Sequence, residues 1–165
     1  MKIFKEILFL KLINEASTLS KKRKHFNLHL SYQEKCQRLF NAIGCNSYIQ
    51  PHRHILDNKT ETLVAIKGLF ALFYFDDLGN TKELYFFGSE LHINKNIDAY
   101  GIEVLPNQWH TVIAMAPNSL LFEVKEGPFH PDLAKEMAPW APKEDSEKAL
   151  PYLNGLISQA IKQLK

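Results

Sequence analysis

The sequence predicts a mainly β protein, an antiparallel barrel or sandwich with a helix near each end of the chain. Between residues 47 and 125, short apolar runs alternate with turn residues, and no helical pattern separates them. Short strands without intervening helices are typical of antiparallel sandwiches and barrels rather than of parallel α/β sheets. The chain has 165 residues, of which 45% are hydrophobic. This size and composition suit one globular domain with its own core.

Residues 1–46 are expected to form an N-terminal helix and a leading strand, both packed on the barrel. Between residues 5 and 16, apolar and charged positions recur at helical spacing, and a run of serine and threonine then ends the pattern. Ser31 and Glu34 have the spacing of a helix-capping box, whereas residues 37–43 read as a strand. We therefore predict a short helical turn that is followed by a strand.

Residues 47–128 are expected to form the barrel core, because turn residues repeatedly interrupt its apolar runs. Asp76–Asn80 and Ala116–Ser119 carry the residue types of hairpin connections. The predicted strands span residues 47–53, 61–67, 69–76, 81–87, 101–105, 109–115 and 119–125.

Residues 129–165 are expected to form a C-terminal extension of the same domain. Their first part is rich in proline and irregular. The last part has apolar residues at three- and four-residue steps, at Leu150, Leu153, Ile157, Ile161 and Leu164. This spacing predicts an amphipathic helix whose apolar stripe covers either the barrel of its own chain or that of a partner.

Composition excludes several classes of function. The net charge is +2, and the densest basic run, Lys21–Lys24, has no interleaved aromatic residues, so we expect no nucleic-acid partner. The apolar stretch Ile7–Leu10 is too short for a signal peptide or a membrane span. Cys36 and Cys45 form no CxxC pair and are too few for a disulfide framework. We therefore expect a cytoplasmic protein without a membrane partner.

Four residues have the chemistry and spacing of a metal site. His52 and His54 are two residues apart in a predicted strand, so both imidazoles point to the same face. Glu61 begins the next predicted strand, where a hairpin could return it beside them, and His110 begins a later strand. Imidazoles together with one carboxylate suit a borderline divalent cation such as zinc, iron, manganese, nickel or cobalt. Calcium would require more oxygen ligands.

These motifs resemble those of the cupin superfamily, in which HxH and Glu are followed by a glycine, here Gly68, and by Gly-x4-Pro-x3-His, here Gly101 to His110. More narrowly, the region of residues 20–146 is similar to the WbuC family of cupin-fold metalloproteins. The blocks that carry this likeness are Asn27-Leu28-His29, Gln37-Arg38, Tyr48-x2-Pro51-His52-Arg53-His54, Pro106-Asn107-x-Trp109-His110, Glu123-Val124-Lys125-Glu126-Gly127-Pro128 and Ala138-Pro139-Trp140-Ala141-Pro142.

The resemblance implies a double-stranded β-helix barrel that holds one metal ion through His52, His54, Glu61 and His110. It implies a link to bacterial surface-polysaccharide biosynthesis but no particular reaction. The sequence departs from the general cupin pattern, because six residues separate His54 from Glu61 and Gln108 replaces a glycine. No asparagine follows His110 at the usual distance. If Glu61 does not reach the ion, three histidines with waters remain, which would favour zinc.

Strand alternation suggests Tyr48, Glu123 and Lys125 as candidate catalytic residues and Gln50 as a further residue that lines the pocket. Tyr48 and Gln50 share the parity of the two histidines, and Glu123 and Lys125 share one face of the last barrel strand. An exposed Glu123–Lys125 ion pair is the alternative interpretation.

Three functions remain open. The first is a metal-dependent enzyme acting on a sugar or nucleotide-sugar, in which Glu123 moves a proton. The second is a non-haem iron dioxygenase, and the third is a non-catalytic sugar-binding or regulatory module. All imply a small ligand, sugar-like in the first and third cases, and the C-terminal helix suggests a homodimer.

Overall fold

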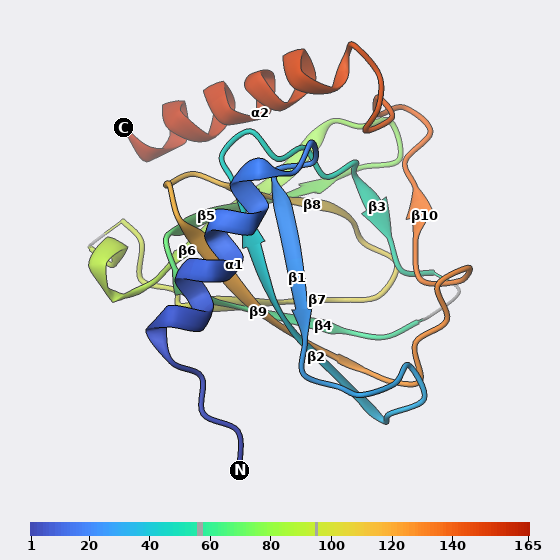
Figure 1. Ribbon diagram of the computed structural model, residues 1–165. Helices are drawn as coiled ribbons and strands as arrows, with labels where there is room; N and C mark the ends of the chain where they lie inside the picture. The colour runs from blue at the N-terminus through green and yellow to red at the C-terminus, as the bar shows by residue number, and fades with distance from the viewer. Residues whose placement is uncertain (56–57, 95) are drawn as a thin grey trace.

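The computed structural model describes residues 1–55, 58–94 and 96–165, and it places two antiparallel sheets face to face with a helix at each end of the chain (Figure 1). The helices are α1 (Glu6–Thr18) and α2 (Ala149–Leu164), with a short 3-10 helix, η1, at Glu90–His92. The strands are β1 (Arg23–Asn27), β2 (Cys36–Ile43), β3 (His52–Arg53), β4 (Glu61–Lys67), β5 (Leu69–Phe75), β6 (Thr81–Gly88), β7 (Gly101–Val104), β8 (Trp109–Ala114), β9 (Ser119–Glu126) and β10 (Glu136–Met137).

Within the described residues, one five-stranded sheet has the order β1-β2-β9-β4-β7 and the other has the order β10-β3-β8-β5-β6. Neighbouring strands pair antiparallel in both sheets. A core cluster that includes Phe70, Leu72, Phe87, Val104 and Leu121 draws residues from both sheets. The predicted fold class, a mainly β antiparallel barrel with terminal helices, is confirmed.

Helix α1 covers the outside of the sheet that contains β1 and β2 (Figure 1). Its buried residues Leu12, Ile13 and Ala16 follow helical spacing and share a cluster with Phe40 and Leu120. The N-terminal helix was predicted over residues 5–16, and the structure extends it to Thr18.

Helix α2 covers the barrel of its own chain. Its buried face consists of Ala149, Leu153, Leu156 and Ala160, which share a cluster with aromatic and aliphatic residues of the sheet containing β5. The predicted stripe was partly misplaced, because Leu150 is 50% exposed and Ile161 is 44% exposed. Two of the four buried positions are alanines, which sequence reasoning that followed large apolar residues overlooked. Neither helix, in the described part of the chain, has the length and apolarity needed to cross a lipid bilayer.

Most barrel strands lie within one or two residues of their predicted bounds, with three differences. The predicted strand 47–53 is reduced to His52–Arg53, and the predicted helical turn near Ser31 is a non-helical turn. Neither β1 nor β10 was predicted. The hairpin expected between His54 and Glu61 includes residues 56 and 57, which lie outside the described residues.

Candidate metal centre

Three histidines meet between the two sheets. His52 on β3 lies directly opposite His110 on β8 in the strand register, and His54 follows β3. One ring nitrogen from each histidine lies within 4.8 Å of those of the other two, and all three side chains are buried. The segment Pro51–His54 thus places His52 and His54 next to His110, which lies more than fifty residues later in the sequence.

Backbone carbonyls fix the tautomer of each ring. The Nδ1 atoms lie 3.0 Å from the oxygen of Gln50 for His52, 2.5 Å from that of Ala134 for His54, and 2.7 Å from that of Gln108 for His110. A carbonyl oxygen can only accept, so each Nδ1 carries the proton and each Nε2 keeps its lone pair. The Nζ atom of Lys125 lies 3.1 Å from Nδ1 of His54. The shorter contact with Ala134 decides that this Nδ1 is a donor.

The Nε2 atoms have the environment of metal ligands. Those of His54 and His110 are buried, and no described residue offers either a hydrogen-bond partner. A buried nitrogen lone pair without a partner is costly, and a cation would satisfy both at once. Metal-bound histidines commonly donate their other ring N–H to a backbone carbonyl, as these three do. Because burial disfavours the charged form, it lowers the pKa of His52 well below its usual value and that of His110 to about 4. The rings of His52 and His110 are therefore neutral, as ligation requires.

Glu61 reaches the same centre from the opposite sheet. Its Oε2 lies 3.6 Å from Nε2 of His54 and 4.0 Å from Nε2 of His110. Burial alone would raise the pKa of Glu61. The polar contact with His54 and the electrostatic effects of His54, Lys135 and His110 outweigh burial and lower the pKa to about 2. The side chain is therefore an ionised carboxylate at neutral pH. Ligand atoms on one ion with bonds of about 2.1 Å lie roughly 3 to 4 Å apart, so these contacts suit a shared cation.

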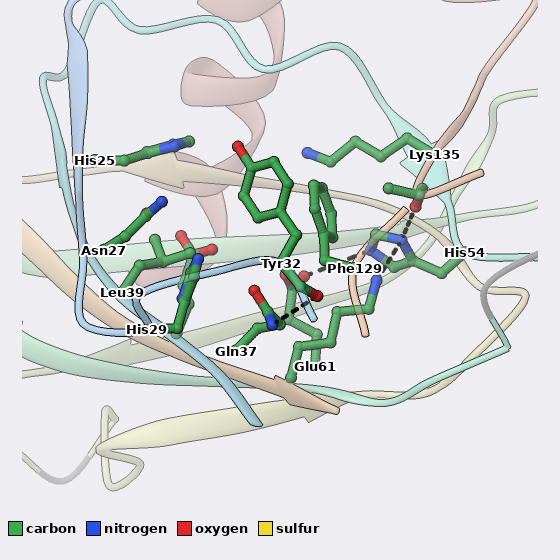
Figure 2. Close-up of a pocket in the computed structure, with 13 residues that line it drawn as sticks. His25, Asn27, His29, Tyr32, Gln37, Leu39, His54, Glu61, Phe129 and Lys135 are labelled. Carbon is green, nitrogen blue, oxygen red and sulfur yellow. Dashed lines mark hydrogen bonds and ion pairs between the residues drawn. The ribbon is translucent and has the colours of Figure 1, made fainter. Parts of the chain in front are cut away.

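A pocket opens from this centre toward β1 and β2. Glu123 and Lys125 on β9 both line it, as predicted from their shared face. Its lining also includes His54 and Glu61, so the pocket reaches the candidate metal ligands (Figure 2). Burial, and then the charge of Glu61, raise the pKa of Glu123 to about 7, although Asn41 donates a hydrogen bond to it. This carboxyl group can therefore both give and take a proton near neutral pH.

Tyr48 and Gln50 lie outside this pocket. The Tyr48 hydroxyl donates to the carbonyl of Pro142, and its ring packs against Tyr152 of α2. Gln50 donates to the carbonyl of Ala138. Residues 47–51 are not in a regular strand, so the alternation that placed both side chains beside the histidines does not apply there. Tyr48 takes no part in the chemistry considered below.

Sequence reasoning missed one wall of the pocket. His25, Asn27 and His29 line it from β1 and the residues just after it, and Lys135 and Phe129 line it from the C-terminal extension (Figure 2). The period-two spacing of these three polar residues could have revealed both the strand and its pocket-facing side.

Comparisons with solved structures identify the fold. CapF in complex with an inhibitor has a TM-score of 0.57 and 9% identity over 73% of this chain and 32% of CapF. Protein SO0799 from Shewanella oneidensis has a TM-score of 0.54 and 11% identity over 86% of this chain and 85% of that protein. Oxalate decarboxylase from Bacillus subtilis has a TM-score of 0.50 and 13% identity over 70% of this chain and 27% of the enzyme. The chain thus spans about a third of CapF, and at these identities the likeness concerns the fold alone, which is that of the cupins.

The sequence comparison that finds a match covers less of the chain than the structural comparisons do. No curated protein matches the chain significantly. One family model, described as a domain of unknown function (DUF6016), matches residues 4–86. This match begins before α1 and includes His52, His54 and Glu61 but not His110, so it spans half of the chain and three of the four candidate ligands. The chain therefore belongs to the DUF6016 family and has the cupin fold.

Proposed function

We propose that this protein is a metal-dependent enzyme that acts on a small, polar, sugar-like substrate. The observation that carries the proposal is the pair of buried, unpartnered Nε2 atoms of His54 and His110 beside the ionised Glu61, at the end of a pocket that also contains Glu123. A bound divalent ion would supply Lewis-acid polarisation of a substrate oxygen. His52, His54, His110 and Glu61 are the residues that would hold it.

The charge of the pocket favours an anionic substrate. Lys125 and Lys135 line the pocket together with the carboxyl groups Glu61 and Glu123. With a divalent cation in place, the pocket has a formal charge of at least +2, and it becomes more positive when Glu123 is protonated. A substrate carrying a carboxylate or phosphate would offset this charge, as a nucleotide-sugar or a sugar acid does.

Glu123 is proposed as the group that moves a proton. Its carboxyl lies on the pocket wall, and Asn41 Nδ2 holds Oε1 at 2.6 Å, which leaves the other oxygen for a substrate. Lys125 is buried on the same strand and offers a positive charge beside a developing oxyanion. A role in surface-polysaccharide biosynthesis would follow from the resemblance to WbuC proteins, and it is part of this proposal.

The proposal is tested by turnover. Metal-loaded protein is offered nucleotide-sugars and sugar acids, and products are followed by mass spectrometry. We expect Glu123→Gln to lower kcat by about 100- to 10,000-fold while metal content stays unchanged. Glu126→Gln at the exposed end of the same strand is the matched control and should retain activity.

Two other outcomes would change the assignment. Bound iron together with substrate-dependent oxygen uptake would favour a dioxygenase instead. A metal-loaded protein that binds sugars but turns none of them over would favour a binding module. Because the decarboxylase named above has Mn(II) centres, manganese is included among the ions that are offered.

A further inference from the structure

One arginine contacts three of the strands that surround the metal centre. Arg53 stands between His52 and His54 in the sequence, where strand alternation directs its side chain away from theirs. Its Nε and Nη2 atoms form a two-pronged ion pair with the carboxylate of Glu136, at 2.8 and 3.1 Å. Its Cζ atom lies 4.2 Å from the ring centroid of Trp109. A single cation thus joins β3, β8 and β10.

The segment before β10 supplies the hydrogen-bond acceptor of His54. The carbonyls that face Nδ1 of the other two histidines belong to residues two positions earlier in the chain. The carbonyl that faces Nδ1 of His54 belongs to Ala134, which is eighty residues away in the sequence. The tautomer of His54 therefore depends on how this distant segment packs against β3.

Strand β10 is a short strand at the edge of its sheet. It has two residues, pairs with β3 alone, and is followed by a hydrogen bond from the N–H of Ala138 to the carbonyl of Pro51 at 2.8 Å. Glu136, which pairs with Arg53, is the first residue of the strand and lies two positions after Ala134. The ion pair therefore adds a side-chain link at the end of β10 that is nearest to Ala134.

The Nδ1 atom of His54 has a second neighbour that would favour the other tautomer. Nζ of Lys125 lies 3.1 Å from it. An ammonium group can only donate, so without the carbonyl of Ala134 this contact would place the lone pair on Nδ1 and the proton on Nε2. A protonated Nε2 cannot bind a metal ion. The position of the carbonyl thus decides whether His54 can serve as a ligand.

We propose that Arg53 and Glu136 are positioning residues of the metal centre, and that their ion pair holds the carbonyl of Ala134 against Nδ1 of His54. This role rests on the proposed function and deepens it, since it names residues that set metal affinity without binding the metal. Asp77 also faces Arg53, at 3.8 Å, but its side chain is 88% exposed and it is therefore a weak partner.

The first test is zinc affinity, which is measured by competition with a chelator, together with urea unfolding of the metal-free protein. Glu136→Ala and Arg53→Met should each weaken zinc binding about 10- to 100-fold, because each removes support from a partner of a ligand histidine. Stability should change little, because a partly exposed ion pair contributes little to folding. Glu136→Gln, which can still accept a hydrogen bond, should lie between the wild type and Glu136→Ala. The double variant should bind zinc no more weakly than Arg53→Met alone.

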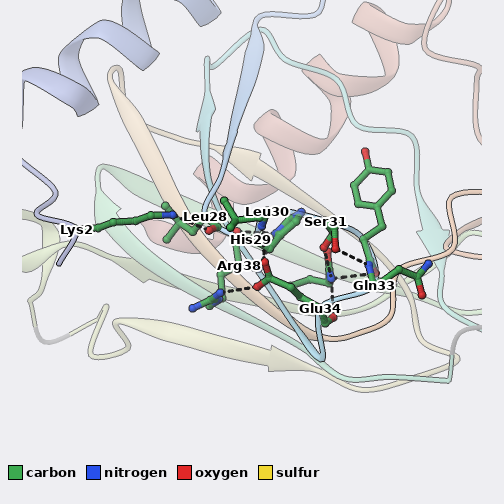
Figure 3. Close-up of polar contacts among 10 residues, drawn as sticks. Lys2, Leu28, His29, Leu30, Ser31, Gln33, Glu34 and Arg38 are labelled. Carbon is green, nitrogen blue, oxygen red and sulfur yellow. Dashed lines mark hydrogen bonds and ion pairs between the residues drawn. The ribbon is translucent and has the colours of Figure 1, made fainter.

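The matched control is Arg38→Met. Arg38 forms an ion pair with Glu34 at 3.0 Å, within one stretch of chain, and neither residue lines the pocket (Figure 3). This variant should bind zinc like the wild type. Unchanged zinc affinity in Glu136→Ala, or an equal loss in Arg38→Met, would overturn the positioning role.

The second test reads the histidine tautomers in the full-length, metal-free protein from the nitrogen-15 shifts of the rings. In the wild type, the proton of His54 should lie on Nδ1. In Glu136→Ala, part of the His54 population should carry it on Nε2, whereas His52 and His110 should keep it on Nδ1. An ion pair that only stabilised the fold would not move one ring and leave the other two unchanged.

The two tests separate the positioning role from the proposed function. A His54 ring that is the same in the wild type and in Glu136→Ala, or that already carries its proton on Nε2 in the wild type, would overturn the positioning role. A wild type that takes up no divalent metal would contradict the proposed function, and the tautomer measurement would still decide whether the ion pair orients His54.

Discussion

At the scale of single residues, the chemistry of the pocket depends on what neighbouring backbone groups do to each side chain. Nδ1 of His54 lies 2.5 Å from the carbonyl oxygen of Ala134, whereas Nδ1 of His29 lies 3.0 Å from the carbonyl oxygen and 3.1 Å from the backbone nitrogen of Arg38. The carbonyl of Ala134 leaves Nε2 of His54 with the lone pair that a cation needs. Sequence could identify the HxH pair by its alternation, but it could not assign the tautomers, because these depend on which backbone carbonyl each ring faces in the folded chain.

Glu123 gives a prediction about stability and pH. Its pKa is about 7 in the folded protein against 4.5 when unperturbed. Because the folded pKa is raised, the favourable contribution of its protonated form is present below about pH 4.5 and is lost as pH rises to about 7. Gln cannot ionise, and its side-chain oxygen can still accept from Asn41. Glu123→Gln should therefore stabilise the metal-free protein at about pH 8, by on the order of 2 kcal/mol.

Urea unfolding in the presence of a chelator checks this prediction, with wild type and variant compared at about pH 4.5 and about pH 8. The difference in unfolding free energy should be close to zero at the lower pH and should grow toward the higher one. A difference of the same size at both values would mean that burial does not perturb this carboxyl group.

At the scale of secondary-structure elements, α2 offers a test of its packing. Leu153 is fully buried under the helix, whereas Leu150, one turn earlier, is 50% exposed. Leu153→Ala should lower the free energy of unfolding by about 2 to 5 kcal/mol, because it leaves a cavity against the sheet. Leu150→Ala should change it by less than about 1 kcal/mol. Equal effects in chemical denaturation would mean that α2 presents a different face to the barrel.

The turn between β4 and β5 offers a second test. Gly68 has a φ of +83°, and a Cβ there would lie 2.1 Å from Oγ and 2.8 Å from Cα of Ser119. Gly68→Ala should lower the melting temperature, because it adds steric overlap to an unfavourable backbone conformation. Gly155 in α2 has open space around it, so Gly155→Ala should stabilise by about 0.5 to 1 kcal/mol. Thermal unfolding of both variants checks the pair, and stabilisation by Gly68→Ala would contradict this account of the turn.

The elements that sequence predicted well are those whose pattern is local. Strands β4 to β9 show short apolar runs bounded by turn residues, and α1 shows helical spacing. Strand β1 was missed because its residues are mostly exposed and polar, and because it begins within a basic run that is typical of a surface loop. The antiparallel pairing with β2, rather than a local sequence pattern, holds these residues in a strand.

At the scale of the whole molecule, the candidate site exists because two sheets face each other. His52 and His110 belong to one sheet, and Glu61, Glu123 and Lys125 belong to the other. Sequence predicted the three histidines and the carboxylate that lie close together in the structure, since histidine and carboxylate spacing is visible in the chain. It could not predict the wall formed by β1 or the position of Lys135, which depend on how the terminal regions fold over the barrel.

The central claim is that the barrel holds one divalent metal through the histidine cluster. The direct measurement is elemental mass spectrometry of protein purified without added metal or chelator, for the wild type, His52→Ala, His110→Ala and the control His92→Ala. We expect close to one metal ion per chain in the wild type and in His92→Ala, and loss of most of it in the other two variants. A wild type that is free of metal and takes up none when it is offered would contradict the account.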